Sequence, residues 1–365
     1  MITKLQLNNF KCFENFSMDL KNVNVFTGIN GMGKSTVIQS LLLLAQSYYQ
    51  DKENKGLILN GKYAELGLAQ DVVYDKASQD ILEIDVINDK GDTFANVFEY
   101  KQDMDYLPFV KQETLSFPQE LNKGRFVYIS AYRIKPQGVY AAISEEELRG
   151  REFGINGEFA LQYLAMYSYT DVSNDKILIK DSHGNSLLNQ TRLWMDRISP
   201  GVAPRIKTIM ANRSTELEFD FIEGENRTNS YKNVNVGFGI TYVLPVVTAL
   251  LTAKEGDLII IENPEAHIHP AGQRMLGELI ARAGAGGAQI MVETHSEHIV
   301  NGIRIEVKQN NIEKEDVNIA FFYKDGEDSY RHKYEQLHVN ADGKMSDWPE
   351  GFFDEWEKAL LELMQ

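Results

Sequence analysis

The sequence predicts an α/β fold with a mixed parallel core sheet, an antiparallel β subdomain and an inserted, mainly helical lobe. Short, fully apolar runs such as residues 258–261 precede helical patterns, which is typical of parallel strands covered on both faces. Residues 2–10 alternate apolar and polar side chains, and residues 81–100 form two similar runs around the turn sequence NDKGD, as antiparallel hairpins do. Residues 144–210 become helical and mixed, which indicates the inserted lobe.

Glycine-rich and polar breaks separate the individual elements. Strands are predicted at residues 2–10, 16–20, 23–28, 56–66, 71–75, 81–89, 93–100, 124–130, 214–224, 258–262 and 288–296. Helices are predicted at residues 33–50, 237–253, 271–287, 297–309 and 352–364. The first of these helices is apolar on almost every side around residues 41–44, which predicts burial on both faces.

The composition limits the classes of function. The chain has 365 residues and a formal net charge of -16, which disfavours a broad, non-specific grip on nucleic acid and leaves a local basic patch as an alternative. The single cysteine, Cys12, excludes an intrachain disulfide and fits a reducing compartment. The N-terminus does not resemble a signal peptide, and no apolar run is long enough to span a bilayer. We expect a soluble, cytoplasmic protein that does not bind membranes.

A phosphate-binding loop is predicted between a strand and a helix, where the segment GINGMGKS satisfies G-x-x-x-x-G-K-S. Its glycines allow a tight turn that brings backbone N–H groups close to anionic oxygens, and the helix N-terminus adds a partial positive charge. The lysine can reach the terminal phosphates, and the Ser35 hydroxyl can coordinate magnesium. The predicted nucleotide-binding residues are Asn30, Gly31, Gly33, Lys34, Ser35 and Thr36.

An acidic segment follows the buried strand at residues 258–261. Glu262 would emerge at the carboxyl edge of the sheet, where ligands bind in open α/β sheets, and would hold magnesium directly or through water. Asn263 and Glu265 follow it closely. His267 and His269 have a weak metal-site spacing with no cysteine to support it, so packing in the turn is favoured over zinc.

A second buried strand, at residues 288–296, ends in the sequence THS at the same predicted edge. His295 could hydrogen-bond the terminal phosphate or the attacking water. The glycine-rich start of the helix at residues 237–253, with Gly237 and Gly239, could face a phosphate of this chain or of a second copy. Arg133 is a candidate for contact with the phosphates or a coupling loop, and a surface ion pair is the alternative.

Together the segments GINGMGKST, VGFGITYVLP, IENPEAHIHP and MVETHSEH resemble the ABC-type AAA ATPase heads of the RecF, SMC and OLD group. The opening ITKLQLNNFKCF resembles the start of those heads, and the tail is similar to a small C-terminal domain of unknown function in some bacterial members. The resemblance implies a P-loop NTPase head that binds ATP and Mg²⁺ and forms a homodimer, or a higher homo-oligomer, through heads that enclose two nucleotides. Gly237–Gly239 would then act in trans as the family signature, and His295 would match the switch histidine.

The resemblance also implies a division of the chain. Residues 1–143 would form the N-terminal lobe of the head and residues 144–215 the helical insertion. Residues 216–316 would form the C-terminal lobe and residues 317–365 a small tail domain.

Asn263 departs from the pattern of the family, in which the second residue of an Asp-Glu pair activates water. Glu262 takes the place of the aspartate, but an amide can only orient water and cannot accept its proton. Either Glu265 serves as the base, or hydrolysis is slow and ATP acts as a long-lived clamp. The predicted catalytic residues are therefore Glu262, Asn263, Glu265 and His295, with Ser35 and Glu262 on the metal.

The predicted function is an ATP-dependent switch in DNA maintenance or in antiviral defence against foreign DNA. A separate effector, a nuclease or toxin, would be its partner, because the chain has no room for an appended nuclease domain. A non-hydrolysing, ATP-loaded scaffold that sequesters a partner protein is one alternative. A RecF-like sensor of DNA structure is another, although the acidic net charge counts against it.

Overall fold

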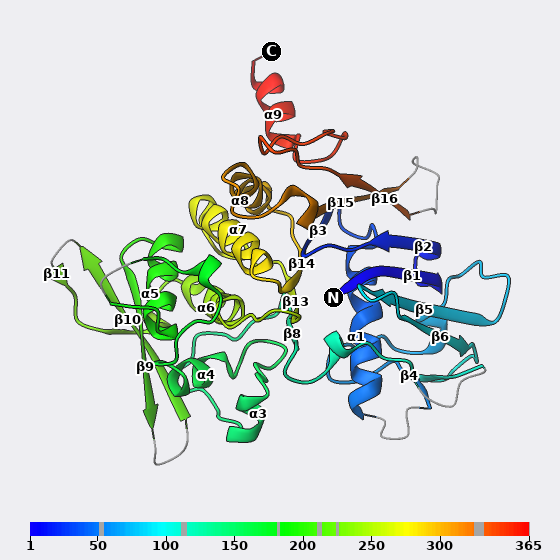
Figure 1. Ribbon diagram of the computed structural model, residues 1–365, viewed down its shortest axis with the longest axis horizontal. Coiled ribbons are helices and arrows are strands. Elements are labelled where there is room, and N and C mark those ends of the chain that lie inside the picture. The colour runs from blue at the N-terminus through cyan, green and yellow to red at the C-terminus, as the bar shows by residue number, and fades with distance from the viewer. Residues whose placement is uncertain are drawn as a thin grey trace. The chain divides into compact units, whose positions relative to one another are not determined.

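The computed structural model describes residues 1–50, 55–110, 115–180, 183–209, 214–223, 226–324 and 332–364, and it divides into two compact units. The first comprises Met1–Asn122, Val317–His338 and Met345–Gln365, and the second comprises Lys123–Asp316 and Val339–Lys344. Each unit contains both helices and strands (Figure 1), as the predicted α/β class requires.

The first unit contains an antiparallel sheet with the strand order β2–β1–β5–β6. Every second residue of β5 is buried, because alternation along a strand places its apolar side chains on one face. The Asn88 side chain closes the β5–β6 turn by accepting hydrogen bonds from the backbone of Lys90 and Asp92. The four strands are β1 (Ile2–Phe10), β2 (Phe13–Asp19), β5 (Ile81–Asn88) and β6 (Thr93–Glu99).

A second group of strands in the first unit supports its main helix. β3 (Val23–Gly28) pairs in parallel with β15 (Val317–Lys324), and β16 (His332–Leu337) is antiparallel to β15. α1 (Lys34–Gln50) follows β3, and its residues 41–44 are fully buried, as their apolar pattern predicts. The remaining short elements of this unit are β4 (Gly56–Ile58), β7 (Tyr106–Pro108) and η1 (Gln119–Leu121).

The predicted strand at residues 71–75 is wrong. Ala69–Val72 form a single helical turn, α2, in which the Asp71 carboxylate accepts a hydrogen bond from Leu68 N at 2.8 Å. An aspartate side chain that binds a nearby backbone N–H offers the backbone an alternative to strand pairing, and here that local bond prevails.

The second unit contains three parallel strands in the order β14–β13–β8. β13 (Leu258–Glu262) lies between β8 (Phe126–Ile129) and β14 (Gln289–Glu293), and its four apolar residues are fully buried. This arrangement confirms the prediction from the apolar run. Three long helices accompany these strands, namely α6 (Phe238–Leu251), α7 (Pro270–Ala285) and α8 (Glu297–Lys308).

The segment between β8 and α6 contains helices and a small sheet. β9 (Val202–Ile209) pairs with β10 (Ser214–Glu223) and was not predicted as a strand. Its Pro204 interrupts the alternation, and proline is tolerated there because β9 pairs only with β10 among the described strands. The other elements of this segment are α3 (Glu145–Arg149), α4 (Ala160–Met166), η2 (Asp175–Ile177), α5 (Leu187–Ile198), β11 (Asn226–Arg227), β12 (Tyr231–Lys232) and η3 (Asn233–Asn235). The short helix η4 (Lys314–Asp316) follows α8.

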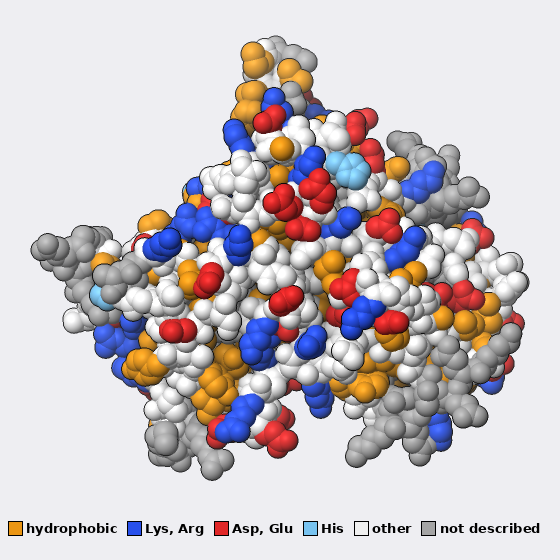
Figure 2. All heavy atoms as spheres, in the orientation of Figure 1, with side chains coloured by type: hydrophobic (Ala, Val, Ile, Leu, Met, Phe, Trp, Pro, Cys, Tyr) orange, Lys and Arg blue, Asp and Glu red, His pale blue; other side chains and the backbone are white. Residues whose placement is uncertain are grey.

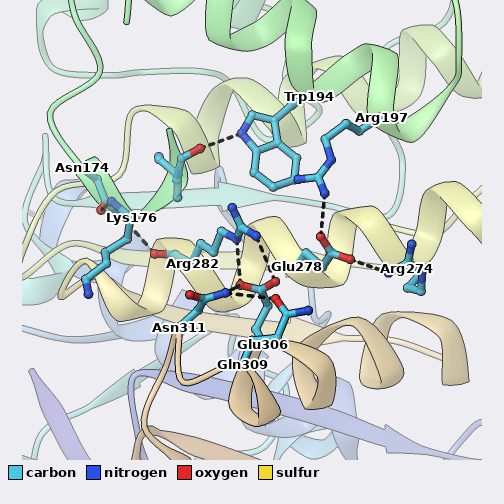
Figure 3. Close-up of polar contacts among 11 residues, drawn as sticks. Asn174, Lys176, Trp194, Arg197, Arg274, Glu278, Arg282, Glu306, Gln309 and Asn311 are labelled. Atoms are coloured by element: carbon cyan, nitrogen blue, oxygen red, sulfur yellow. Dashed lines mark hydrogen bonds and ion pairs between the residues drawn. The ribbon is translucent and has the colours of Figure 1, made fainter. Parts of the chain in front are cut away.

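Ion pairs join α5, α7 and α8 (Figure 3). Arg282 of α7 binds Glu306 of α8 through two hydrogen bonds of 2.7 and 3.1 Å, and Glu306 is fully buried. Glu278 of α7 accepts hydrogen bonds from Arg197 of α5 and from Arg274. Burial raises the pKa of the Glu278 carboxyl, whereas the two arginines act in the opposite direction. These contacts hold the helix of the inserted segment against the helices that follow β13 and β14.

The C-terminal helix α9 (Glu355–Leu363) carries exposed apolar side chains, which gather on it in Figure 2. Trp356, Leu363 and Met364 are largely exposed, and Leu361 is also exposed. In the part of the chain that the structure describes, no helix combines the length and the apolar character needed to cross a membrane.

Candidate nucleotide site

The loop between β3 and α1 takes the shape that its glycines allow. Gly28, Gly31 and Gly33 have φ angles of 130°, 76° and 103°, which side chains other than glycine rarely adopt. A Cβ at Gly28 would lie 2.2 Å from the carbonyl oxygen of Phe322 in β15, whereas the space around Gly31 is open. The Lys34 ammonium donates to the carbonyl oxygens of Gly28 and Ile29 at 2.8 and 2.9 Å, so the loop curls around its own lysine.

The predicted binding residues differ in their exposure. Asn30 and Gly31 are exposed, Gly33 and Ser35 are half-buried, and the side chains of Lys34 and Thr36 are buried. Exposed N–H groups at the start of a helix are suited to an anion such as a phosphate, and the Ser35 hydroxyl is an oxygen donor of the kind that Mg²⁺ prefers.

Three side chains from other segments surround this loop. A Cβ at Gly33 would lie 2.6 Å from the Phe13 ring. The Cys12 thiol donates to the Thr36 hydroxyl over 3.6 Å, and burial raises the pKa of that thiol. His332 Nε2 lies 3.1 Å from the carbonyl oxygen of Gly31. Sequence reasoning missed this histidine, because it is 301 residues from Gly31 and no local pattern connects the two.

In the second unit, Glu262 ends β13, and its burial raises the pKa of its carboxyl. Ala131 N donates to its Oε2 at 3.3 Å, and the hydroxyl of Tyr128 in β8 also hydrogen-bonds to it. A carboxylate of this kind fits a divalent cation, which would favour the charged form. Tyr128 was not predicted, because it sits within a strand and reaches Glu262 only through the parallel pairing of β8 with β13.

Asn263 begins the turn after β13 with a φ of 42°, in the left-handed region that asparagine tolerates. Its N–H donates to the Glu293 carbonyl oxygen at 2.8 Å, which joins the ends of β13 and β14. Its side-chain Oδ1 is buried and accepts no hydrogen bond from the described residues. This oxygen is therefore a free acceptor at the carboxyl end of the parallel strands.

Arg133 holds the backbone of this turn. Its guanidinium donates to the carbonyl oxygens of Glu262 and Asn263 at 2.5 and 3.1 Å. The residue is 4% exposed, which excludes the surface ion pair, and burial lowers its pKa to about 10. We assign it a role in fixing the turn that carries Glu262 and Asn263.

Glu265 connects this turn to the segment after β14. Its two carboxylate oxygens accept hydrogen bonds from the Thr294 hydroxyl at 2.8 Å and from the His295 backbone N–H at 2.7 Å. The His295 residue is exposed, so its backbone is held while its ring is accessible. Glu262, Asn263, Glu265 and His295 therefore lie at the ends of two paired parallel strands, as predicted from the strand pattern.

The glycines and histidines nearby have structural contacts. A Cβ at Gly239 would lie 2.0 Å from the carbonyl oxygen of His267, so the start of α6 packs directly on this turn, whereas the space at Gly237 is open. The His267 ring contacts the ring of Phe238 edge-on. His269 caps α7, since its Nδ1 accepts a hydrogen bond from Ala271 N at 3.3 Å.

Comparison with known families identifies the chain. Residues 1–159 and 185–300, which include both groups of site residues, match the model of the AAA ATPase domain. The chain belongs to this ATPase family. Residues 312–363 of the ATPase also match a family described only as a protein of unknown function, DUF3696. No curated protein matched significantly.

Solved structures with the same fold as this ATPase include heads of Smc proteins. A Smc head bound to the C-terminal winged-helix domain of ScpA has a TM-score of 0.50 at 12% identity, covering 93% of this chain and 98% of that one. A Smc head with an extended coiled coil, bound to the C-terminal domain of ScpA and derived from Pyrococcus furiosus, has a TM-score of 0.53 at 12% identity. It covers 100% of this chain and 99% of the other. These likenesses confirm the predicted head fold.

Proposed function

We propose that this ATPase is a nucleotide-controlled switch in which the loop at residues 28–35 and the cluster around Glu262 act on one ATP. The observation that carries the proposal is the loop itself, with three glycines at positive φ and Lys34 inside the turn at the start of α1. The family model supports the combination because it spans both segments. Ser35 and Glu262 would hold Mg²⁺, which neutralises charge on the terminal phosphates when bound.

We propose further that the switch closes as a homodimer around two nucleotides. Each loop would face the Gly237–Gly239 segment of the second copy, and His295 would lie near the terminal phosphate. Closure requires that ATP bind the closed state more tightly than the open one, and contacts from the second copy would supply that difference.

Hydrolysis in this proposal is slow. An amide at position 263 could at most orient a water molecule and cannot take the proton of that water. ATP would therefore hold the closed state for a long time, and a separate effector, a nuclease or toxin in DNA maintenance or antiviral defence, would be held or released with it. The Smc heads bound to domains of ScpA support the idea that heads of this fold take separate protein partners.

The same asparagine favours a second candidate, a scaffold that binds ATP without hydrolysing it. Phosphate release by the purified protein, measured together with its sedimentation with and without ATP and Mg²⁺, separates the two. Phosphate release with ATP-dependent dimerisation supports the switch. Retained ATP with no phosphate release supports the scaffold. If the protein does not bind ATP, both candidates are wrong.

Replacing Asn263 with aspartate is expected to raise the kcat for ATP hydrolysis by roughly tenfold to a hundredfold, because it supplies a proton acceptor where the amide only orients water. Aspartate tolerates the φ of 42° at this position, so the turn should persist. Asn263→Ala, which removes both groups, is the matched control and should lower kcat. Equal rates for the aspartate variant and the wild type would show that this position does not limit hydrolysis.

A further inference from the structure

Glu265 lies in the turn after β13 but makes its side-chain contacts with the segment after β14. One carboxylate oxygen accepts from Thr294 Oγ1 at 2.8 Å and the other from the His295 N–H at 2.7 Å. Thr294 is fully buried, and its hydroxyl also accepts a hydrogen bond from Ser296 N at 3.0 Å. Both oxygens of Glu265 are thus used to fix the backbone on which His295 is carried.

A second set of hydrogen bonds holds Ser296, the residue that follows His295 in the chain. The Ser296 hydroxyl donates to Gln273 Oε1 at 2.6 Å and accepts from the N–H groups of His298 and Ile299, which makes it the N-cap of α8. The residues on both sides of His295 are therefore fixed by the turn and helix that follow β13, while His295 itself is exposed. A side chain carried on a backbone held in this way is pre-organised.

We propose that Glu265 is the positioning residue of His295, and not the base that activates water. The inference rests on the proposed hydrolysis of ATP. The sequence left two alternatives, Glu265 as the base or slow hydrolysis without one, and the inference favours the second. A general base must direct a lone pair at the water proton within hydrogen-bond reach. Each oxygen of Glu265 already accepts one hydrogen bond from the Thr294–His295 segment, so the carboxylate is oriented toward that segment, and turning it toward a water elsewhere would weaken the bonds that hold His295.

Two substitutions distinguish these roles, because they separate the charge of Glu265 from its hydrogen bonds. In Glu265→Gln the amide oxygen can still accept from His295 N, and the amide nitrogen can donate to the Thr294 hydroxyl. The positioning role predicts that kcat falls by less than about tenfold, whereas loss of a base predicts roughly a hundredfold or more.

In Thr294→Val the Glu265 carboxylate and its hydrogen bond from the His295 N–H remain, but the hydrogen bond from the Thr294 hydroxyl is lost. The positioning role predicts that kcat falls by about tenfold with little change in the KM for ATP, as expected when a group is misplaced in the transition state only. Thr294→Ser keeps the hydroxyl and should recover most of the lost kcat. A base at Glu265 predicts that Thr294→Val has the rate of the wild type.

The backbone amide resonance of His295, observed in protein labelled with ¹⁵N-histidine, tests the same contact without relying on turnover. Its chemical shift should move clearly in Glu265→Ala and remain close to the wild-type position in Glu265→Gln. The proposal is overturned if Glu265→Gln abolishes turnover, if Thr294→Val retains full activity, or if the resonance does not move in Glu265→Ala. If the wild type hydrolyses no ATP, the proposed hydrolysis fails, and the resonance still decides whether Glu265 holds His295.

Discussion

Replacing Lys34 with alanine is expected to reduce ATP hydrolysis by roughly a hundredfold to a thousandfold, the cost of removing a group that stabilises charge in a transition state. The Lys34 side chain is buried in the loop, where its ammonium lies against the carbonyl oxygens of Gly28 and Ile29. Alanine removes the positive charge that would face the terminal phosphates and also leaves those carbonyl oxygens without this donor.

Phosphate release and the Kd of a fluorescent ATP analogue should be measured together, so that lost chemistry and lost binding are told apart. Lys4→Ala is the matched control, since Lys4 lies in the same unit and, among the described residues, its side chain makes an exposed ion pair of 3.6 Å with Asp19. It should hydrolyse ATP at the wild-type rate. Wild-type turnover by Lys34→Ala would show that the loop does not bind the hydrolysed nucleotide.

Replacing Glu306 with alanine is expected to lower the free energy of unfolding by about 3 kcal/mol. Glu306 is fully buried and receives two hydrogen bonds from Arg282 and a third from Asn311 (Figure 3). Its removal leaves the Arg282 guanidinium, whose side chain is only 18% exposed, without its counter-charge between α7 and α8. Most of the cost is this uncompensated charge, because the pair itself offsets its own desolvation only in part.

Urea unfolding followed by circular dichroism measures this effect. Glu145→Ala is the control, because it removes the glutamate of an exposed i,i+4 pair with Arg149 at the surface of α3. That variant should unfold at the wild-type midpoint within experimental error. A Glu306→Ala variant as stable as the wild type would show that the ion pair between α7 and α8 contributes no net stability.

Sequence reasoning succeeded where one pattern dominated a segment. The apolar run of β13 and the glycines of the loop at residues 28–35 left few alternatives, so the parallel strands and the shape of the loop were predicted correctly. It failed where a single side chain competed with the pattern, as Asp71 did in α2 and Pro204 in β9.

The components of the candidate site were predictable in type but not in their contacts. The order of the strands placed Glu262 and His295 at one sheet edge, because parallel strands end on the same side. The hydrogen bonds of Glu265 depend on the exact course of two turns that are about 30 residues apart, and Arg133 could not be paired with backbone carbonyls from its sequence alone. The sequence offered a contact with the phosphates or a coupling loop, or a surface ion pair, for Arg133. Neither alternative was the support of the turn at Glu262 and Asn263 that its hydrogen bonds indicate.

The pairing of β15 with β3 changes how the C-terminal region of this ATPase should be regarded. Residues 312–363 match a family of unknown function, yet β15 and β16 lie within them and β15 runs in register beside the strand that leads into the phosphate loop. Gly28 faces Phe322 in that register. A truncation before this region would therefore remove β15, the strand that pairs with β3 in the first unit. The phenotype of such a deletion should not be interpreted as the loss of an independent accessory module.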